Sequence, residues 1–416
     1  MATLAQSDAV PTPAPAARGL NLVMVARVIR AFGDGFVAIL LPVHLTRLGF
    51  SPVGIGLIAT STLLGSALLT LALGFLAHHL HLRRGLLGAA LLMTGTGLGF
   101  AYLHAFWPLL LIAFVGTLNP SGGDVSVFLP LEHTLIARLA SDQTRTAAYG
   151  RYSFVGNVGV ALGSLAIGSL DWLERILPPG TAINVLFLLY GAIGLATLCL
   201  YLRLPDVTAS GPGPTAALGP SRKRVYGLAA LFAVDAFGGG FIVNSLLAVW
   251  LFERFGLSVA TTGTIFFAIG ICSALSYFGA VQLATRFGLV NTMVFTHLPS
   301  NILLILAALA PTLGLAVALL VLRSLLSQMD VPTRSSYVMA VVQPAERPAA
   351  ASLTAVPRSL ASAMAPMLSG WALSLSPFGW PLVCAGLLKI AYDLTLLRYF
   401  RAIRPPEEER QSAPSS

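Results

Sequence analysis

Long apolar runs follow one another along almost the whole chain, separated by short stretches that contain charges, glycine or proline. Each run has about 20 to 30 residues, the length that an α-helix needs to cross the hydrocarbon core of a bilayer. The pattern predicts an all-α membrane protein with twelve transmembrane helices. These helices are expected at residues 22–46, 52–78, 85–104, 107–138, 147–171, 182–204, 224–252, 259–285, 288–310, 312–342, 348–376 and 379–402.

The second half of the chain repeats features of the first half. Gly33 to Phe36 reads Gly-Asp-Gly-Phe, and 205 residues later Gly238 to Phe241 reads Gly-Gly-Gly-Phe in the same context. Gly168 and Gly370 close the matching helices further on. A duplicated apolar unit predicts two pseudo-symmetric six-helix bundles, and such bundles bind a solute between their halves and rock around it.

The composition of the connecting segments sets the expected domain boundaries. Residues 1–20 and 403–416 are polar and are expected to be disordered tails. The first bundle is expected at residues 21–204 and the second at residues 224–402. Between them, residues 205–223 are rich in proline and glycine and end in basic residues, as expected for a cytoplasmic linker.

Composition excludes several classes of protein. Hydrophobic residues make up 56% of the chain and charged residues only 10%, whereas a soluble domain has about 25% charged residues. The net charge is +9, but no basic patch is interleaved with aromatic residues, so nucleic acid is not expected as a partner. The three cysteines lack the spacing of a metal site, and no phosphate-binding loop or nucleophile–base pair stands out. The sequence therefore predicts neither an enzyme nor a cofactor.

Arginine and lysine are distributed unequally between the two sides of the predicted bundle. Fifteen lie in segments on the side of the termini, and three, Arg47, Arg175 and Arg254, lie on the opposite side. Positive residues concentrate in cytoplasmic loops. Both termini are therefore expected in the cytoplasm, with the chain in the plasma (inner) membrane.

The loop between the second and third predicted helices carries Gly74, His78 and the basic pair Arg83 and Arg84. With twelve helices, a basic central loop and a six-plus-six repeat, this chain resembles the major facilitator superfamily over essentially its whole length. In that family the same loop reads Gly, three residues, Asp, Arg, then Gly and basic residues. The resemblance implies a gating loop here, although His78 cannot supply the fixed negative charge of the family's cytoplasmic latch.

The resemblance also implies that helices 1, 4, 7 and 10 line a central cavity. A charged group near the bilayer centre costs about 2.5 to 3.5 kcal/mol or more, so such groups persist where they are paired or line a wet space. The candidates for substrate binding or proton coupling are Asp34, Asn119, Asp124, Glu132, Asp235, Gln328, Asp330, Arg334, Tyr337 and Arg358.

Asp34 lies near the middle of the first helix between two glycines, and Arg30 precedes it by one turn. Because residues four apart share a helix face, the two side chains can form an ion pair. Asp34 is therefore either a protonatable or substrate-contacting carboxylate, or one half of a structural ion pair.

The fourth helix is expected to be broken between Gly116 and Asp124. Pro120 removes the backbone donor that would reach the Gly116 carbonyl. Non-helical backbone at membrane depth is tolerated where it lines a cavity, so Asp124 is a candidate binding residue. A packing kink is the alternative.

The tenth helix is unusually polar near its middle. Asp330, the repeat partner of Asp124, shares a helix face with Arg334, and Tyr337 is expected on the same wall. This segment is expected to bind solute or couple ions, or else to latch the two halves. Arg358 is expected to neutralise a carboxylate or to attract an anionic solute.

Two other patterns favour structural roles. Gly156, Gly159 and Gly163 have the spacing that allows close helix packing. Lys389 and Asp393, four residues apart, are expected to neutralise each other.

The sequence thus predicts a secondary active transporter that moves a small organic solute by alternating access. We expect coupling to protons or another ion, a monomer in the lipid bilayer, and export, by analogy with other compact chains. The alternative is a non-transporting membrane receptor or scaffold of the same fold, which would be expected to have lost the polar residues of its central helices.

Overall fold

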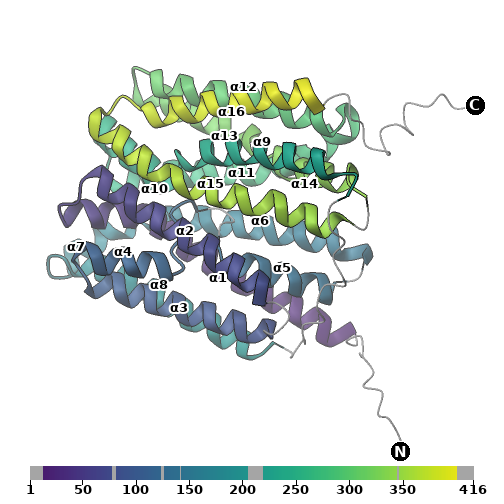
Figure 1. Ribbon diagram of the computed structural model, residues 1–416. Coiled ribbons are helices and arrows are strands. Elements are labelled where there is room, and N and C mark those ends of the chain that lie inside the picture. Colours follow the sequence, from purple (N-terminus) through teal and green to yellow (C-terminus); the bar gives the residue numbers. More distant parts are fainter. Residues whose placement is uncertain are drawn as a thin grey trace, which may run out of the picture.

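The computed structural model describes residues 13–76, 81–122, 126–140, 142–204, 219–343 and 346–400. This part of the chain forms sixteen α-helices that lie side by side in one bundle (Figure 1). The helices are α1 (Pro13–Arg47), α2 (Pro52–Leu76), α3 (Leu82–Tyr102), α4 (Phe106–Val115), α5 (Phe128–Leu139), α6 (Asp142–Ala166), α7 (Ser169–Ile176), α8 (Thr181–Leu202), α9 (Arg222–Gly240), α10 (Asn244–Phe255), α11 (Val259–Phe287), α12 (Leu289–Leu309), α13 (Leu313–Ser327), α14 (Asp330–Ala340), α15 (Arg347–Leu375) and α16 (Trp380–Phe400).

These helices form the twelve predicted membrane spans, because α4 and α5, α6 and α7, α9 and α10, and α13 and α14 are successive parts of single spans. Eight helical segments of the described residues are long and apolar enough to cross a membrane, and α4 and α13 are shorter apolar helices. One boundary is corrected: α1 begins at Pro13, inside the segment expected to be a tail.

Three spans are interrupted away from their ends, and only the break in the fourth was expected from the sequence. In the fourth span α4 ends at Val115 and α5 begins at Phe128; between them Pro120 cannot donate an N–H and Gly122 has a φ of +62°. The seventh span breaks directly after Gly238 to Gly240, and the tenth between Ser327 and Asp330. Glycine and proline weaken helix interiors, so the fourth and seventh breaks follow directly from local sequence.

The repeat seen in the sequence is also a repeat in packing. A Cβ atom at Gly35 of α1 would lie 2.1 Å from the Val160 carbonyl oxygen of α6. A Cβ atom at Gly240 of α9, 205 residues later, would lie 2.2 Å from the Ser362 carbonyl oxygen of α15. Gly163 of α6 is equally close to α1, since a Cβ there would meet the Phe32 carbonyl oxygen. The small-residue pattern of the fifth span therefore serves the close helix packing that was predicted for it.

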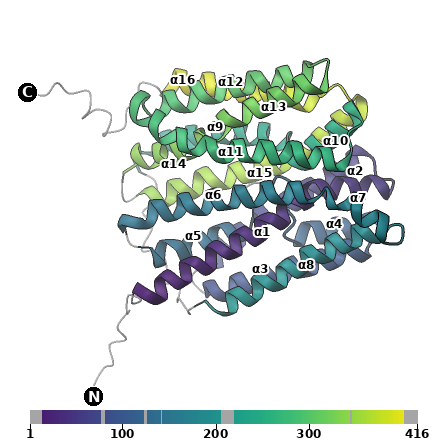
Figure 2. The same cartoon turned by 180° about the vertical axis from the view of Figure 1, so that it is seen from behind.

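The two halves meet along α2 with α15 and along α6 with α11. The start of α1 and the end of α16 lie at the same end of the bundle (Figures 1 and 2). We call the opposite end, which carries Arg47 and Pro52, the distal end. There a Cβ atom at Gly370 would lie 2.3 Å from the Pro52 carbonyl oxygen, so this glycine lets α15 approach α2 closely.

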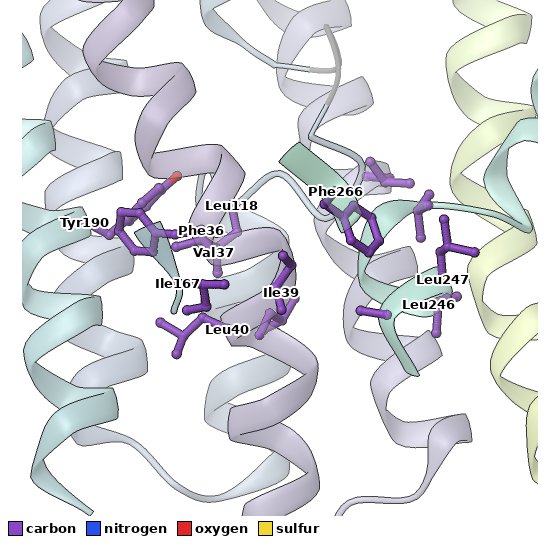
Figure 3. Close-up of a cluster of buried hydrophobic side chains, with 14 of the residues drawn as sticks. Phe36, Val37, Ile39, Leu40, Leu118, Ile167, Tyr190, Leu246, Leu247 and Phe266 are labelled. Atoms are coloured by element: carbon purple, nitrogen blue, oxygen red, sulfur yellow. The ribbon is translucent and has the colours of Figure 1, made fainter. Parts of the chain in front are cut away.

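Apolar and hydrogen-bonded contacts close the halves against each other in the distal part of the bundle. Figure 3 shows Ile39 and Leu40 of α1 near Leu246 and Leu247 of α10, all of them buried in one hydrophobic cluster. The Ser245 hydroxyl of α10 donates to the Ala38 carbonyl of α1 at 2.7 Å. These contacts join α1 to α10 across the boundary between the halves.

Candidate functional site

A buried carboxylate organises the polar interior of the first half. Glu132 of α5 forms an ion pair with Arg30 of α1. It also accepts hydrogen bonds from the hydroxyls of Tyr152 on α6 and Tyr201 on α8, both at 2.6 Å. None of the four side chains is more than 1% exposed. Glu132 therefore ties four spans together through charge-assisted hydrogen bonds.

Asp34 of α1 is buried but has different partners from those expected. Its carboxylate lies close to the Asn119 side chain and to the Tyr190 hydroxyl on α8, which donates to the Thr117 carbonyl at 3.0 Å. Arg30, which was expected as its helical partner, is engaged by Glu132 instead. Among the described residues, no arginine or lysine nitrogen lies within ion-pair distance of Asp34.

The break in the fourth span brings polar backbone toward the second half. The Asn119 side-chain oxygen accepts hydrogen bonds from the Ser121 amide at 3.2 Å and hydroxyl at 2.6 Å. The Pro120 carbonyl accepts a hydrogen bond from the Ser245 amide of α10 at 3.0 Å. Asp124, the predicted binding residue of this segment, lies outside the described residues.

Asp235 of α9 is the corresponding centre of the second half. It receives the Arg334 guanidinium of α14 at 2.8 Å and the Lys389 ammonium of α16 at 2.7 Å. Its carboxylate also lies 3.7 Å from Nε2 of His297 on α12. Arg334 reaches Asp330 at 3.3 Å as well, as their four-residue spacing predicted. Arg334 therefore pairs with both Asp330 and Asp235, and Asp235 is the closer of the two carboxylates.

The expected pairing of Lys389 with Asp393 is wrong. Lys389 reaches across to Asp235, while Asp393 accepts from the side-chain amide of Asn301 at 3.0 Å and lies 2.9 Å from Nδ1 of His297. Both residues are buried on α16, which packs against α9 and α12. Packing between spans therefore overrides the pairing suggested by helical spacing.

The two halves carry the same kind of cluster with opposite polarity. Arg30 and Asp235 stand 205 positions apart, the same offset as the repeated glycines. In the first half, α1 supplies the cation and α5 the carboxylate. In the second half, α9 supplies the carboxylate and α14 the cation. Each half thus has an ion pair between its first and fourth spans. The cation lies on the first of these spans in one half and on the fourth in the other.

The remaining predicted residues are distributed less uniformly. Gln328 lies at the break after α13 and accepts from the Tyr277 hydroxyl of α11 at 3.3 Å. Tyr337 was expected on the wall of Arg334, but it is buried and donates to the Phe400 carbonyl of α16 at 3.2 Å. Arg358 of α15 has an exposed side chain near Arg334.

The predicted gating loop is only partly described. Gly74 lies in the last turns of α2, and His78 lies outside the described residues. Arg83 donates to the Leu202 carbonyl at the end of α8, in its own half, and Arg84 is exposed. The described contact of this loop thus joins two spans of one half.

Several members of these clusters escaped the sequence analysis. Tyr152, Tyr190 and Tyr201 resemble core aromatics in an apolar helix, and nothing local marks their hydroxyls as partners of carboxylates. His297 and Asn301 carried a usable signal, because two polar side chains four residues apart share one face of an otherwise apolar helix.

Comparison with known proteins agrees with this architecture. A family model described as Major Facilitator Superfamily matches residues 23–234 and 228–416. A relative in Saccharomyces cerevisiae, the uncharacterized membrane protein YJR124C, is 24% identical, over 93% of this chain and 95% of its own.

Solved structures share the fold at low identity. A bacterial homolog of the human lysosomal transporter Spinster, in an inward-facing state, has a TM-score of 0.70 and 16% identity, over 95% of this chain and 99% of that chain. A D-xylose–proton symporter has a TM-score of 0.69 and 16% identity, over 92% of this chain and 98% of that chain. At such identities the likeness shows the fold alone.

Proposed function

Because the chain belongs to the Major Facilitator Superfamily, we propose that this secondary transporter couples the movement of a small organic solute to protons, with Asp34 as the proton-binding carboxylate. The solute would bind between the halves, and alternating closure at the two ends would carry it across. The distal closure joining α1 and α10 supports one of the two states that this cycle requires.

The observation that carries the proposal is the contrast between Asp34 and the other buried carboxylates. Glu132 has one cation and two tyrosine hydroxyls, and Asp235 has two cations. Protonating either would leave a buried arginine or lysine without its carboxylate, which is strongly unfavourable. Protonating Asp34 disrupts no ion pair among the described residues, and Tyr190 and Asn119 can hydrogen-bond to either form. Asp34 can therefore exchange a proton at a lower structural cost than Glu132 or Asp235.

The orientation belongs to the same proposal. The excess of basic residues on the side of the termini supports a cytoplasmic location for both ends of the chain. We also place the protein in the plasma membrane, as part of the same proposal. The closed distal end would then face outward, and the solute would enter or leave on the cytoplasmic side in this state.

The test uses purified protein reconstituted in liposomes, an imposed pH gradient and a chemically diverse solute panel. Asp34→Asn should abolish gradient-driven accumulation while keeping solute exchange between the two sides, because exchange needs no net proton movement. Glu174→Gln, a change to a partly exposed carboxylate, is the matched control and should accumulate solute normally. Accumulation by Asp34→Asn at the wild-type level would refute the assignment. Running the gradient in both senses measures whether the protein imports or exports.

Asp330→Asn belongs in the same series, since Asp330 was the other carboxylate expected to couple ions. Retained exchange with lost accumulation in this variant alone would move the proton site to the tenth span. A complete lack of solute movement by the wild-type protein across a broad panel would favour the alternative, a receptor or scaffold. The retention of buried charges in the first, fourth, seventh and tenth spans speaks against that alternative.

A further inference from the structure

Charged side chains within the second half do not balance. Between α9 and α16, the cations within the spans and away from their ends are Arg323, Arg334, Arg358 and Lys389, whereas the carboxylates are Asp235, Asp330 and Asp393. Among the described residues this leaves one more cation than carboxylate when His297 is neutral. An uncompensated charge in a membrane interior is costly, and it usually marks a path or a site for a counter-charge.

Two of these cations, Arg323 of α13 and Arg358 of α15, form no ion pair with a carboxylate among the described residues, and Arg358 is the exposed one of the two. Among the described residues its guanidinium forms no ion pair and no hydrogen bond, and its strongest electrostatic neighbour is the like charge of Arg334. Asp235 and Asp330 lie in its surroundings, but both contact Arg334 directly. Two guanidinium groups in the same surroundings repel each other, and an anion between them would offset this repulsion.

The Arg358 side chain is also accessible. It is exposed, whereas its neighbours Asp235, Asp330 and Tyr392 are no more than 4% exposed. An exposed side chain among buried charged residues means that an opening reaches this part of the interior. Arg358 is therefore available to a solute that enters between the helices.

Tyr392 of α16 supplies an independent sign of a missing ligand. Its side chain is 1% exposed, and its hydroxyl has no hydrogen-bond partner among the described residues. Both Arg334 and Arg358 lie within electrostatic range of this hydroxyl. A buried hydroxyl without a partner loses its hydrogen bonds to water, so such groups are rare unless a water or a ligand completes them.

We infer that Arg358, together with Arg334 and the Tyr392 hydroxyl, binds an oxyanion of the transported solute, a carboxylate or phosphate group. This inference rests on the proposed transport function and names the class of its substrate. Guanidinium groups bind carboxylates and phosphates through two parallel N–H donors, and a tyrosine hydroxyl can donate a third hydrogen bond. An oxyanion between the two arginines would offset their repulsion and satisfy the hydroxyl.

The first test uses pairs of probes that differ only in the oxyanion: glucose 6-phosphate and glucose, uridine monophosphate and uridine, succinate and succinamide. Thermal stabilisation of the purified transporter is measured at constant ionic strength. We expect at least one anionic probe to stabilise the protein while its neutral partner does not. Equal effects of both members of every pair, or no effect of any anion, would overturn the inference.

Variants then assign the site. Arg358→Gln should weaken binding of the stabilising anion at least about tenfold, and Arg358→Lys should recover part of it, because lysine keeps the charge but not the paired donors. Tyr392→Phe should weaken binding less. Arg224→Gln, at an exposed position in the first turn of α9, is the matched control. Wild-type affinity in Arg358→Gln would overturn the assignment.

Labelling with phenylglyoxal, which reacts with accessible arginines, tests the site without transport. Arg358 should be modified in the free protein and protected by the stabilising anion, whereas Arg30, buried against Glu132, should react in neither state. Failure to modify Arg358 would contradict its accessibility.

Two further outcomes separate this inference from its premise. Protection of Arg358 by phosphatidylglycerol, but by no soluble anion, would assign the site to a lipid headgroup and overturn the solute. Proton-coupled transport of neutral solutes only would leave the proposed function standing and refute the oxyanion.

Discussion

Replacing Glu132 by glutamine tests whether one buried carboxylate holds the first half together. The change keeps the size of the side chain and removes its charge. Arg30, 1% exposed, then loses its ion-pair partner, and its Nε already has no hydrogen-bond partner among the described residues. The new amide NH2 group also presents donors where Glu132 accepted from Tyr152 and Tyr201.

The magnitude follows from these contacts. Breaking a buried ion pair by removing one partner costs about 3–5 kcal/mol. Removing a hydroxyl that donates to a charged group costs about 1.5–3 kcal/mol, so Tyr152→Phe and Tyr201→Phe should each fall below Glu132→Gln. These losses are not additive, because all of them involve one carboxylate. The double variant Arg30→Met with Glu132→Leu removes both charges and should recover most of the stability lost in Glu132→Gln.

The assay is denaturant unfolding of the purified protein in detergent, followed by tryptophan fluorescence at neutral pH. The expected order of stability is wild type, then the two tyrosine variants, then Glu132→Gln, with the double variant above Glu132→Gln. The reasoning would be refuted by a double variant less stable than Glu132→Gln, since the ion pair would then stabilise the fold beyond satisfying its own charges.

Three further predictions concern other parts of the molecule. Gly370→Ala should widen the distal end, because the new Cβ would lie 2.3 Å from the Pro52 carbonyl oxygen. Distances between spin labels on the two halves measure this widening. Gly314→Ala is the control and should leave those distances unchanged, because a Cβ there would have nothing within 4 Å. Hydrogen bonds from Ser221 and Gly219 hold the pKa of Glu346 below its ordinary value, so this contact is present at neutral pH and is lost only as the pH falls through that lowered pKa. Glu346→Gln should therefore raise hydrogen exchange of the Gly219 amide at pH 7, and unchanged exchange would refute the contact. Asp330→Asn should keep gradient-driven accumulation, because Asp34 carries the proton and Arg334 retains Asp235 as its partner. Uncoupled transport that is not restored in the double variant with Arg334→Gln would instead make Asp330 the coupling carboxylate.

Local sequence predicted most of the architecture. A run of apolar residues of membrane length forms a helix in lipid because every backbone group must be satisfied within the segment. The break after Val115 was expected from Pro120 and the glycines that follow it. The break after Gly240 was not expected, although three consecutive glycines explain it. The repeated glycines likewise predicted matching positions in the two halves, since only a residue without a Cβ allows such close helix packing.

The identity of the interior charges was also visible in the sequence, because an acidic or basic residue in an apolar run is conspicuous. Their partners were not. Spacing of four residues suggested Arg30 with Asp34 and Lys389 with Asp393, yet Arg30 meets Glu132, 102 positions away, and Lys389 meets Asp235, 154 positions away. Only the Asp330–Arg334 contact followed its spacing, and even there Asp235 is the closer partner.

The physical reason lies in the range of the forces involved. Helix formation and helix breaks depend on backbone groups within a few residues of one another, and the sequence lists these directly. An ion pair depends on which helix faces are brought within about 4 Å, where the attraction in a low-dielectric interior is large. Side-chain packing over the whole bundle decides those faces. The sequence by itself therefore determined the spans, the repeat and the charges. Only the tertiary structure decided which charges pair, and it leaves Asp34, Arg323 and Arg358 without an ion-pair partner among the described residues.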